Sequence, residues 1–197
     1  MANRTYLYAE RPHEDGNSRI FSIGEFSSGI PLAYRLLCSA NTERVPSKIF
    51  DDHPNDETGE IIGPGAFRGS FPEGREILLQ FMERLADTNS KNLHLPEDTL
   101  AEEFASTRKE LFHERLLGCT HFWLEPLEVL ALGDNIPDEL ESLAAAIPQT
   151  ESEINYVLDM WESGDFEPYN SAQEYFYSLG FGSWSDILYF QFQNPDN

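Results

Sequence analysis

The sequence predicts an α+β fold, with short N-terminal strands around one helix, then a mainly helical C-terminal half and a possible final strand. Two observations predict this class. Short runs rich in β-branched and aromatic residues lie near the start of the chain, whereas apolar residues at helical spacing dominate from residue 70 onward. A chain of 197 residues, 40% of them hydrophobic, can bury a core of its own.

The first sixty residues read as short strands around one helix. Residues 5–8 (T-Y-L-Y) and 19–23 (R-I-F-S-I) predict two strands, joined by a polar segment that contains a proline and a glycine and suits a hairpin loop. Residues 30–37 (I-P-L-A-Y-R-L-L) predict a helix with proline in its first turn. Residues 47–50 and 60–62 are candidates for further short strands.

Two long helices follow. Ser70 and Glu73 form a capping-box pattern ahead of apolar residues that extend at helical spacing to Leu85. The polar residues 87–95 (D-T-N-S-K-N-L-H-L) indicate a linker. Residues 96–117 predict the second helix, whose acids crowd its start and whose basic residues crowd its end, as the helix dipole favours.

The remaining elements are shorter. Residues 135–146 predict a helix capped by Asn135. Thr150 and Glu153 form a second capping-box pattern, ahead of a helix predicted to end at Gly164. A third helix is predicted to start after Ser171, and the apolar residues 187–192 form the possible final strand. The linker divides the chain into an N-terminal α/β lobe, residues 1–88, and a mainly helical acidic lobe, residues 96–197; one compact domain is the alternative.

Charge is distributed very unevenly along the chain. All 13 basic residues lie at or before Arg115, and the 82 residues that follow carry 15 acidic side chains and no Lys or Arg. The net charge of −22 therefore divides into −7 for the first 115 residues and −15 for the rest. A folded surface of this sign favours a basic protein partner, and it disfavours direct binding to nucleic acid or to an anionic membrane.

Several segments resemble metal-binding or phosphate-binding motifs but lack the residues or the spacing that those motifs require. The acidic loop at residues 51–60 lacks the glycine and the oxygen ligand that a calcium loop needs at its sixth and third positions, and the glycines at residues 63–69 lack the Lys-Ser/Thr end of a phosphate loop. His113, Cys119 and His121 match no zinc spacing. We therefore expect no metal, no cofactor and no catalytic residue.

The two cysteines and the N-terminus indicate the cellular compartment of the protein. Cys38 and Cys119 lie in apolar contexts that favour reduced, buried thiols, and the chain starts without an apolar signal region. No apolar run approaches the length of a membrane span. We expect a cytoplasmic protein.

The candidate partner-binding surface lies in the cation-free half. Acids and tyrosines alternate there over a predicted loop and the start of the next helix, and tyrosines give large contact areas while carboxylates complement Arg and Lys. The predicted residues are Glu162, Asp165, Glu167, Tyr169, Glu174 and Tyr177, with Asp186 as a possible neighbour.

Two segments carry a family resemblance. The start M-A-N-R-T-Y-L-Y at residues 1–8 and the helix I-P-L-A-Y-R-L-L at residues 30–37 resemble a family of small, acidic, uncharacterised bacterial proteins that share M-A-N-R-x-Y-L-Y and I-P-L-x-Y-[KR]-L-L. This resemblance covers roughly the first half of the chain. In size and acidity the chain also resembles, more generally, the immunity proteins of bacterial polymorphic toxin systems. Neither resemblance implies particular functional residues.

These observations lead to three hypotheses about function. The first is an immunity-type inhibitor that occludes the active site of a cognate toxin with a basic cleft, of the nuclease or ADP-ribosyltransferase class. The second is a DNA mimic that regulates a nucleic-acid enzyme, which needs carboxylates spaced like phosphates along a face. The third is a small cytosolic enzyme that acts near Cys119 and His121.

Overall fold

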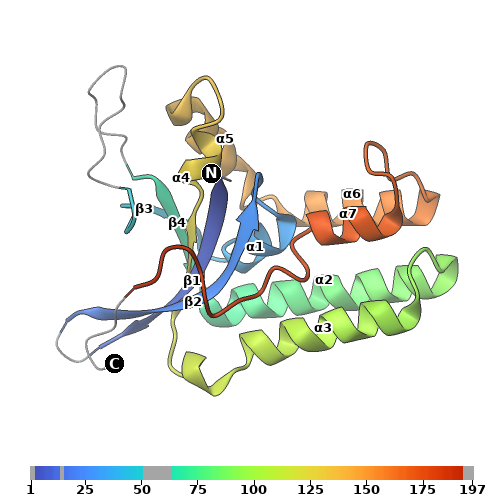
Figure 1. Cartoon of the computed structure of the whole chain (residues 1–197), viewed down its shortest axis with the longest axis horizontal. Helices are drawn as coiled ribbons and strands as arrows, with labels where there is room; N and C mark the ends of the chain where they lie inside the picture. Colours follow the sequence, from blue (N-terminus) through green and yellow to red (C-terminus); the bar gives the residue numbers. More distant parts are fainter. Residues whose placement is uncertain (1–2, 14–15, 51–63, 193–197) are drawn as a thin grey trace.

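The computed structural model describes residues 3–13, 16–50 and 64–192, and it contains an antiparallel sheet with helices packed against one face (Figure 1). Within this part of the chain the sheet has five strands, which lie in the order β2-β1-β5-β4-β3. Their bounds are β1 Arg4–Pro12, β2 Ser18–Ser27, β3 Glu43–Val45, β4 Ala66–Ser70 and β5 His121–Glu125.

The helices alternate with these strands early in the chain and then follow one another. The described helices are α1 Leu32–Leu37, α2 Phe71–Asn92, α3 Glu97–Leu111, α4 Leu127–Leu130, α5 Ile136–Ala146, α6 Thr150–Ser163 and α7 Ala172–Ser178, with a 3₁₀ turn, η1, at Glu114–Leu116. The α+β fold, with strands near the start and a helical C-terminal half, is as the sequence predicts.

Alternation along the central strands builds two layers. Leu7 and Ala9 of β1, with Phe122 and Leu124 of β5, face the helices and join the main core, which extends through α1, α2 and α6 to Phe181. Tyr6 and Tyr8, which alternate with Leu7 and Ala9 along β1, face the opposite side of the sheet. Because β5 lies between β1 and β4, strands from both predicted lobes share one sheet.

The first turn of α2 lies directly against the end of α1. A Cβ atom at Gly74 would lie 2.0 Å from the backbone oxygen of Leu37, so only glycine permits this contact. From here α2 and α6 run side by side: Arg84 contacts Glu151 and Asn89 contacts Trp161. The two helices extend away from the sheet, and the later turns of both lie far from it (Figure 1).

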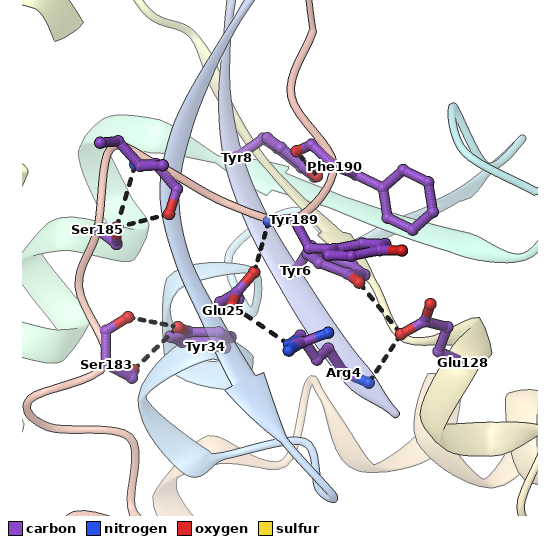
Figure 2. Close-up of polar contacts among 11 residues, drawn as sticks. Arg4, Tyr6, Tyr8, Glu25, Tyr34, Glu128, Ser183, Ser185, Tyr189 and Phe190 are labelled. Atoms are coloured by element: carbon purple, nitrogen blue, oxygen red, sulfur yellow. Dashed lines mark hydrogen bonds and ion pairs between the residues drawn. The ribbon is translucent and has the colours of Figure 1, made fainter. Parts of the chain in front are cut away.

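The C-terminal segment, residues 183–192, starts on the helix side of the sheet, where Trp184 packs against Tyr34, and then crosses the outer face (Figure 2). Tyr8 donates a hydrogen bond to the Phe190 carbonyl oxygen at 2.9 Å, and the Tyr189 amide donates to Glu25 Oε2 at 2.8 Å. Glu25 also pairs with Arg4, at 3.2 Å. The predicted final strand at residues 187–192 is not formed, because this segment lies across the strands and pairs with none of them in a ladder.

Several other local predictions are wrong. The predicted linker at residues 87–95 is largely helical, because the buried Asn89 side chain bonds both the amide and the carbonyl of Leu95 and holds the end of α2. Residues 47–50 form a turn in which Ser47 Oγ accepts from the Phe50 amide at 2.8 Å. The sequence missed β3, β4 and β5. The acidic loop at residues 51–60 and the candidate strand at residues 60–62 lie outside the described residues.

Some of the predicted helix caps form and others do not. Asn135 and Ser171 cap α5 and α7 through their side chains, and Gly164 ends α6 in a left-handed conformation. Ser70 makes no cap bond, because its side chain contacts Glu73 and its backbone continues β4. The predicted Thr150 cap is also absent: Thr150 lies inside α6, and Glu153 pairs with Arg35 instead.

Candidate functional site

The outer side of α6 and the loop after it form an exposed acidic surface. Ile154, Val157 and Trp161 bury one side of the helix against the core. Asp159 and Glu162 lie on the exposed side. After the turn at Gly164 the chain continues with Asp165 and Glu167, both exposed.

These acids differ from others nearby because no basic side chain neutralises them. Glu151 pairs with Arg84 at 2.9 Å, and Glu153 pairs with Arg35. Within the described part of the chain, Asp159, Glu162, Asp165 and Glu167 form no ion pair, and their side-chain charge faces solvent. Like charges this close repel one another, so the free protein gains nothing from holding them together.

The loop that carries two of these acids is held by packed aromatic rings. Trp161 lies with its ring centroid 5.2 Å from that of Phe166, and Phe166 lies 5.6 Å from Tyr175. The Trp161 indole donates to Asn89 Oδ1 at 3.1 Å, and the His94 ring packs edge-on against Phe166, with centroids 5.3 Å apart. The acidic loop is therefore built on the core.

The structure separates the predicted tyrosines from the acids. Tyr169 is half-buried against Tyr175, with ring centroids 5.2 Å apart. Tyr177 donates to Glu103 Oε1 at 3.1 Å, and burial together with that carboxylate raises the pKa of Tyr177. Both rings are used in packing, which reduces the area that a partner can contact.

Glu174 and Asp186 are also placed apart from the α6 acids. Glu174 Oε2 accepts from the backbone amide of Asn170 at 2.9 Å and from its side chain at 2.8 Å, and these hydrogen bonds lower the pKa of Glu174. Asp186 lies in the C-terminal segment, near enough to act on the guanidinium of Arg115. Of the seven predicted residues, Glu162, Asp165 and Glu167 are brought together.

Sequence reasoning missed Tyr156, which is 63% exposed on the outer side of α6. It lies one turn before Asp159, so an unpacked aromatic ring adjoins the unpaired acids. The signal was present in the sequence, because Tyr156 falls outside the apolar spacing of Ile154, Val157 and Trp161. We call Tyr156, Asp159, Glu162, Asp165 and Glu167 the α6 acidic face.

The structure does not bring His113, Cys119 and His121 into one constellation. His113 Nδ1 accepts from the Arg115 amide at 3.2 Å and caps η1, whereas His121 Nδ1 contacts Thr120 Oγ1 at 2.8 Å at the start of β5. Cys119 is buried, and burial raises its pKa to about 11. Such a thiol is protonated at neutral pH and is a poor nucleophile. Among the described residues no group of three His, Cys, Asp or Glu side chains could hold a metal ion.

Fold and surface together define an α+β protein with one helix-covered antiparallel sheet and an unpaired acidic face on α6. The model of a protein family, described as a domain of unknown function (DUF7822), matches residues 9–163. This match covers more than half of the chain, so the chain belongs to that family. It runs from β1 to the end of α6 and stops before Asp165 and Glu167.

No curated protein and no solved structure matches the chain. None of the described helices is both long enough and apolar enough to span a membrane.

Proposed function

We propose that this protein is an immunity-type inhibitor, which binds a cognate bacterial toxin and covers the basic cleft of the toxin's active site. Toxins of the nuclease and ADP-ribosyltransferase classes bind phosphate-bearing substrates, so their clefts carry Arg and Lys. Inhibition by occlusion requires complementary charge and shape, and it requires no catalytic residue on this chain.

The unpaired state of the α6 acidic face carries this proposal. Arginines from distant parts of the chain neutralise Glu151 and Glu153, yet none of the described basic residues pairs with Asp159, Glu162 or the acids of the loop after α6. Repulsion among these like charges raises the free energy of the unbound protein, and contact with the cations of a basic partner would lower it.

Tyr156 supplies the second property of an interface. A tyrosine in the middle of a contact contributes a large rigid area at low entropic cost, and tyrosines are frequent among residues that dominate binding energy. Tyr156 is 63% exposed in the free protein, so binding would remove apolar area from water. Acids around it would then pair with cations of the partner in a desolvated site.

The direct test immobilises the full-length protein and captures its partner from a lysate of the native cell. The captured protein is identified by mass spectrometry and assayed for nuclease and ADP-ribosyltransferase activity, with and without added inhibitor. Support requires an enzyme with a basic cleft that stoichiometric wild-type protein inhibits. A partner whose activity is unaffected by the complex contradicts the proposal.

Reversing the charge of the α6 acidic face is expected to weaken that complex. In Asp159→Lys/Glu162→Lys, two attractive contacts become repulsive, so Kd should rise at least about tenfold, equivalent to 1.4 kcal/mol. Stability of the free protein should be unchanged or slightly raised, because lysines in the last turns of α6 interact favourably with the helix dipole. Kd is measured by calorimetry and stability by thermal unfolding.

The matched control is Asp134→Lys/Glu139→Lys, which changes the net charge by the same amount. Both acids are exposed and belong to the same cation-free half, but they lie at α5, away from the end of α6 (Figure 1). This variant should bind almost as the wild type does. Equal loss in both variants would mean that total charge matters and the α6 face does not.

Association should also depend on salt. Charge steers the encounter of oppositely charged surfaces, and the Debye length shortens from about 30 Å at low salt to about 8 Å at physiological salt. The on-rate, measured by stopped flow with the captured partner, should therefore fall steeply over this range, and the fall should be smaller for Asp159→Lys/Glu162→Lys. An on-rate independent of salt would rule out steering.

A further inference from the structure

A second feature lies at the opposite end of α2, beside the connection from α3 to β5. There the structure holds a cavity of about 160 Å³. Its lining residues are Phe71, Pro72, Arg75, Phe112, His113 and Leu116 to Cys119. No lining residue is acidic, in a chain that carries 35 acids and a net charge of −22.

Arg75 is the charged residue of this cavity, and it has no carboxylate partner in the described part of the chain. Its guanidinium lies between two aromatic rings, 4.5 Å from the Phe71 centroid and 4.6 Å from the Phe112 centroid. One nitrogen donates weakly to the Leu111 carbonyl at 3.4 Å, and Nε is buried without a hydrogen-bond partner. Burial lowers the pKa of Arg75, so its charge is poorly solvated.

Other arginines of this protein show what Arg75 lacks. Arg35, Arg84 and Arg115, for example, each pair with a glutamate. This protein has many carboxylates, yet Arg75 lies between two rings without a carboxylate partner. Its guanidinium can therefore bind an anion from solution.

Neighbouring groups raise the positive potential at the same place. His113 lines the cavity and its Nδ1 accepts from the Arg115 amide, so Nε2 is the ring nitrogen that can donate to a ligand. Arg11 donates to the Leu117 carbonyl oxygen at 2.8 Å. Arg11, Arg75 and Arg115 each act to lower the pKa of Cys119, and each has a larger effect than Glu10, which acts to raise it. The first turn of α2, a helix of 22 residues, adds the positive end of its dipole.

The rim of the cavity is apolar. Phe112 is 55% exposed and Leu117 is 71% exposed, although most large apolar residues of this chain are buried. The cavity is also smaller than the roughly 300 Å³ at which pockets for drug-sized ligands begin. An occupant therefore combines an anionic head with a short apolar group.

We propose that this cavity binds a small organic anion, whose carboxylate or phosphate oxygens are held by Arg75 and His113 and whose apolar part lies against Phe112 and Leu117. The site is independent of the proposed inhibitor function. Arg75 and Asn89, which adjoins the core side of α6, are separated by about 20 Å along α2, at 1.5 Å per residue.

The test uses calorimetry on the full-length protein with four probes: benzoate, phenyl phosphate, inorganic phosphate and the neutral benzyl alcohol. Saturable binding of benzoate or phenyl phosphate is expected, and the tighter of the two identifies the head group. Inorganic phosphate should bind more weakly, because it lacks the apolar part, and benzyl alcohol should not bind. Failure of both aromatic anions to bind overturns the site.

Variants assign the binding to Arg75. Arg75→Gln should weaken the aromatic anion at least about tenfold, because a charge-assisted hydrogen bond is lost. The control Arg84→Gln, which removes an arginine paired with Glu151, should bind as the wild type does. Retained binding in Arg75→Gln contradicts the proposal.

A second measurement does not depend on how well Arg75→Gln folds. Cys119 lines the cavity, so a bound anion should slow its alkylation in the wild-type protein under alkaline conditions. Alkylation of Cys38, which is fully buried elsewhere in the core, provides the internal reference. An unchanged rate at Cys119 under saturating anion would place the ligand outside this cavity.

Discussion

Trp161→Ala is expected to lower the free energy of unfolding by about 3–5 kcal/mol, the range for removing a large buried aromatic side chain. Trp161 is fully buried, and its ring contacts Phe166, Tyr175 and Phe176. Alanine would leave a cavity between α2 and α6 and remove the hydrogen bond to Asn89. Equilibrium unfolding in urea, followed by far-UV circular dichroism, measures the loss.

Two further variants serve as controls for this measurement. Trp161→Phe keeps much of the ring volume but removes the indole N–H, so its loss should lie well below that of Trp161→Ala. Tyr156→Ala changes an exposed aromatic residue on the other side of the same helix and should cost little, within about 0.5 kcal/mol. If Trp161→Ala cost no more than Tyr156→Ala, the aromatic cluster would not be part of the stabilising core.

Glu125→Leu is expected to cost on the order of 3 kcal/mol or more, because it leaves several buried donors without an acceptor. Glu125 is fully buried on the outer face of β5. Its carboxylate accepts from Trp123 Nε1 at 2.9 Å, from Ser47 Oγ at 2.6 Å and from the Lys48 amide at 2.7 Å. Each orphaned donor costs about 1–3 kcal/mol.

The conservative variant separates hydrogen bonding from packing. Glu125→Gln keeps one carbonyl oxygen for Trp123 and Lys48, so it should lose clearly less stability than Glu125→Leu. Urea unfolding gives the two stabilities, and the indole N–H resonance of Trp123 reports on the local bond. Equal stability of Glu125→Leu and the wild type would show that these donors find water instead.

The helices that the sequence predicts best are those with local signals. Asn135 and Ser171 mark the starts of α5 and α7, and Gly164 marks the end of α6, because a cap depends on residues a few positions apart. The Ser70 and Thr150 patterns fail for the opposite reason. Ser70 is the last residue of β4, and Glu153 pairs with the distant Arg35, so neither residue is available for a capping box.

β5 escaped prediction because it is short and buried on both faces. Phe122 and Leu124 face the helices while Trp123 and Glu125 are buried beneath the outer cover, so apolar and polar residues do not alternate. Its partners, β1 and β4, lie more than fifty residues away along the chain. Pairing at that distance leaves no local trace in the sequence.

The sequence predicts the charge of the candidate surface, but not which of its acids stay unpaired or which of its tyrosines stay exposed. An absence of cations after Arg115 identifies the acidic half, but it does not tell which acids remain unpaired. Arg35 and Arg84 neutralise Glu153 and Glu151 across 118 and 67 residues, a result of tertiary packing. Likewise, Tyr177 is occupied by Glu103 and Tyr156 is left exposed only once the helices have packed.

The central position of β5 has a consequence for the order in which the protein can fold during synthesis. β1 with β2, and β3 with β4, form two separate antiparallel pairs, and β5 is the strand that joins them. About fifty residues separate the end of β4 at Ser70 from the start of β5 at His121, which takes on the order of 2–10 s to translate. During that interval both pairs present an unpaired strand edge, the arrangement most open to association with other chains. A ribosome-bound chaperone therefore has a defined period in which to act, and it ends when His121–Glu125 enters the sheet.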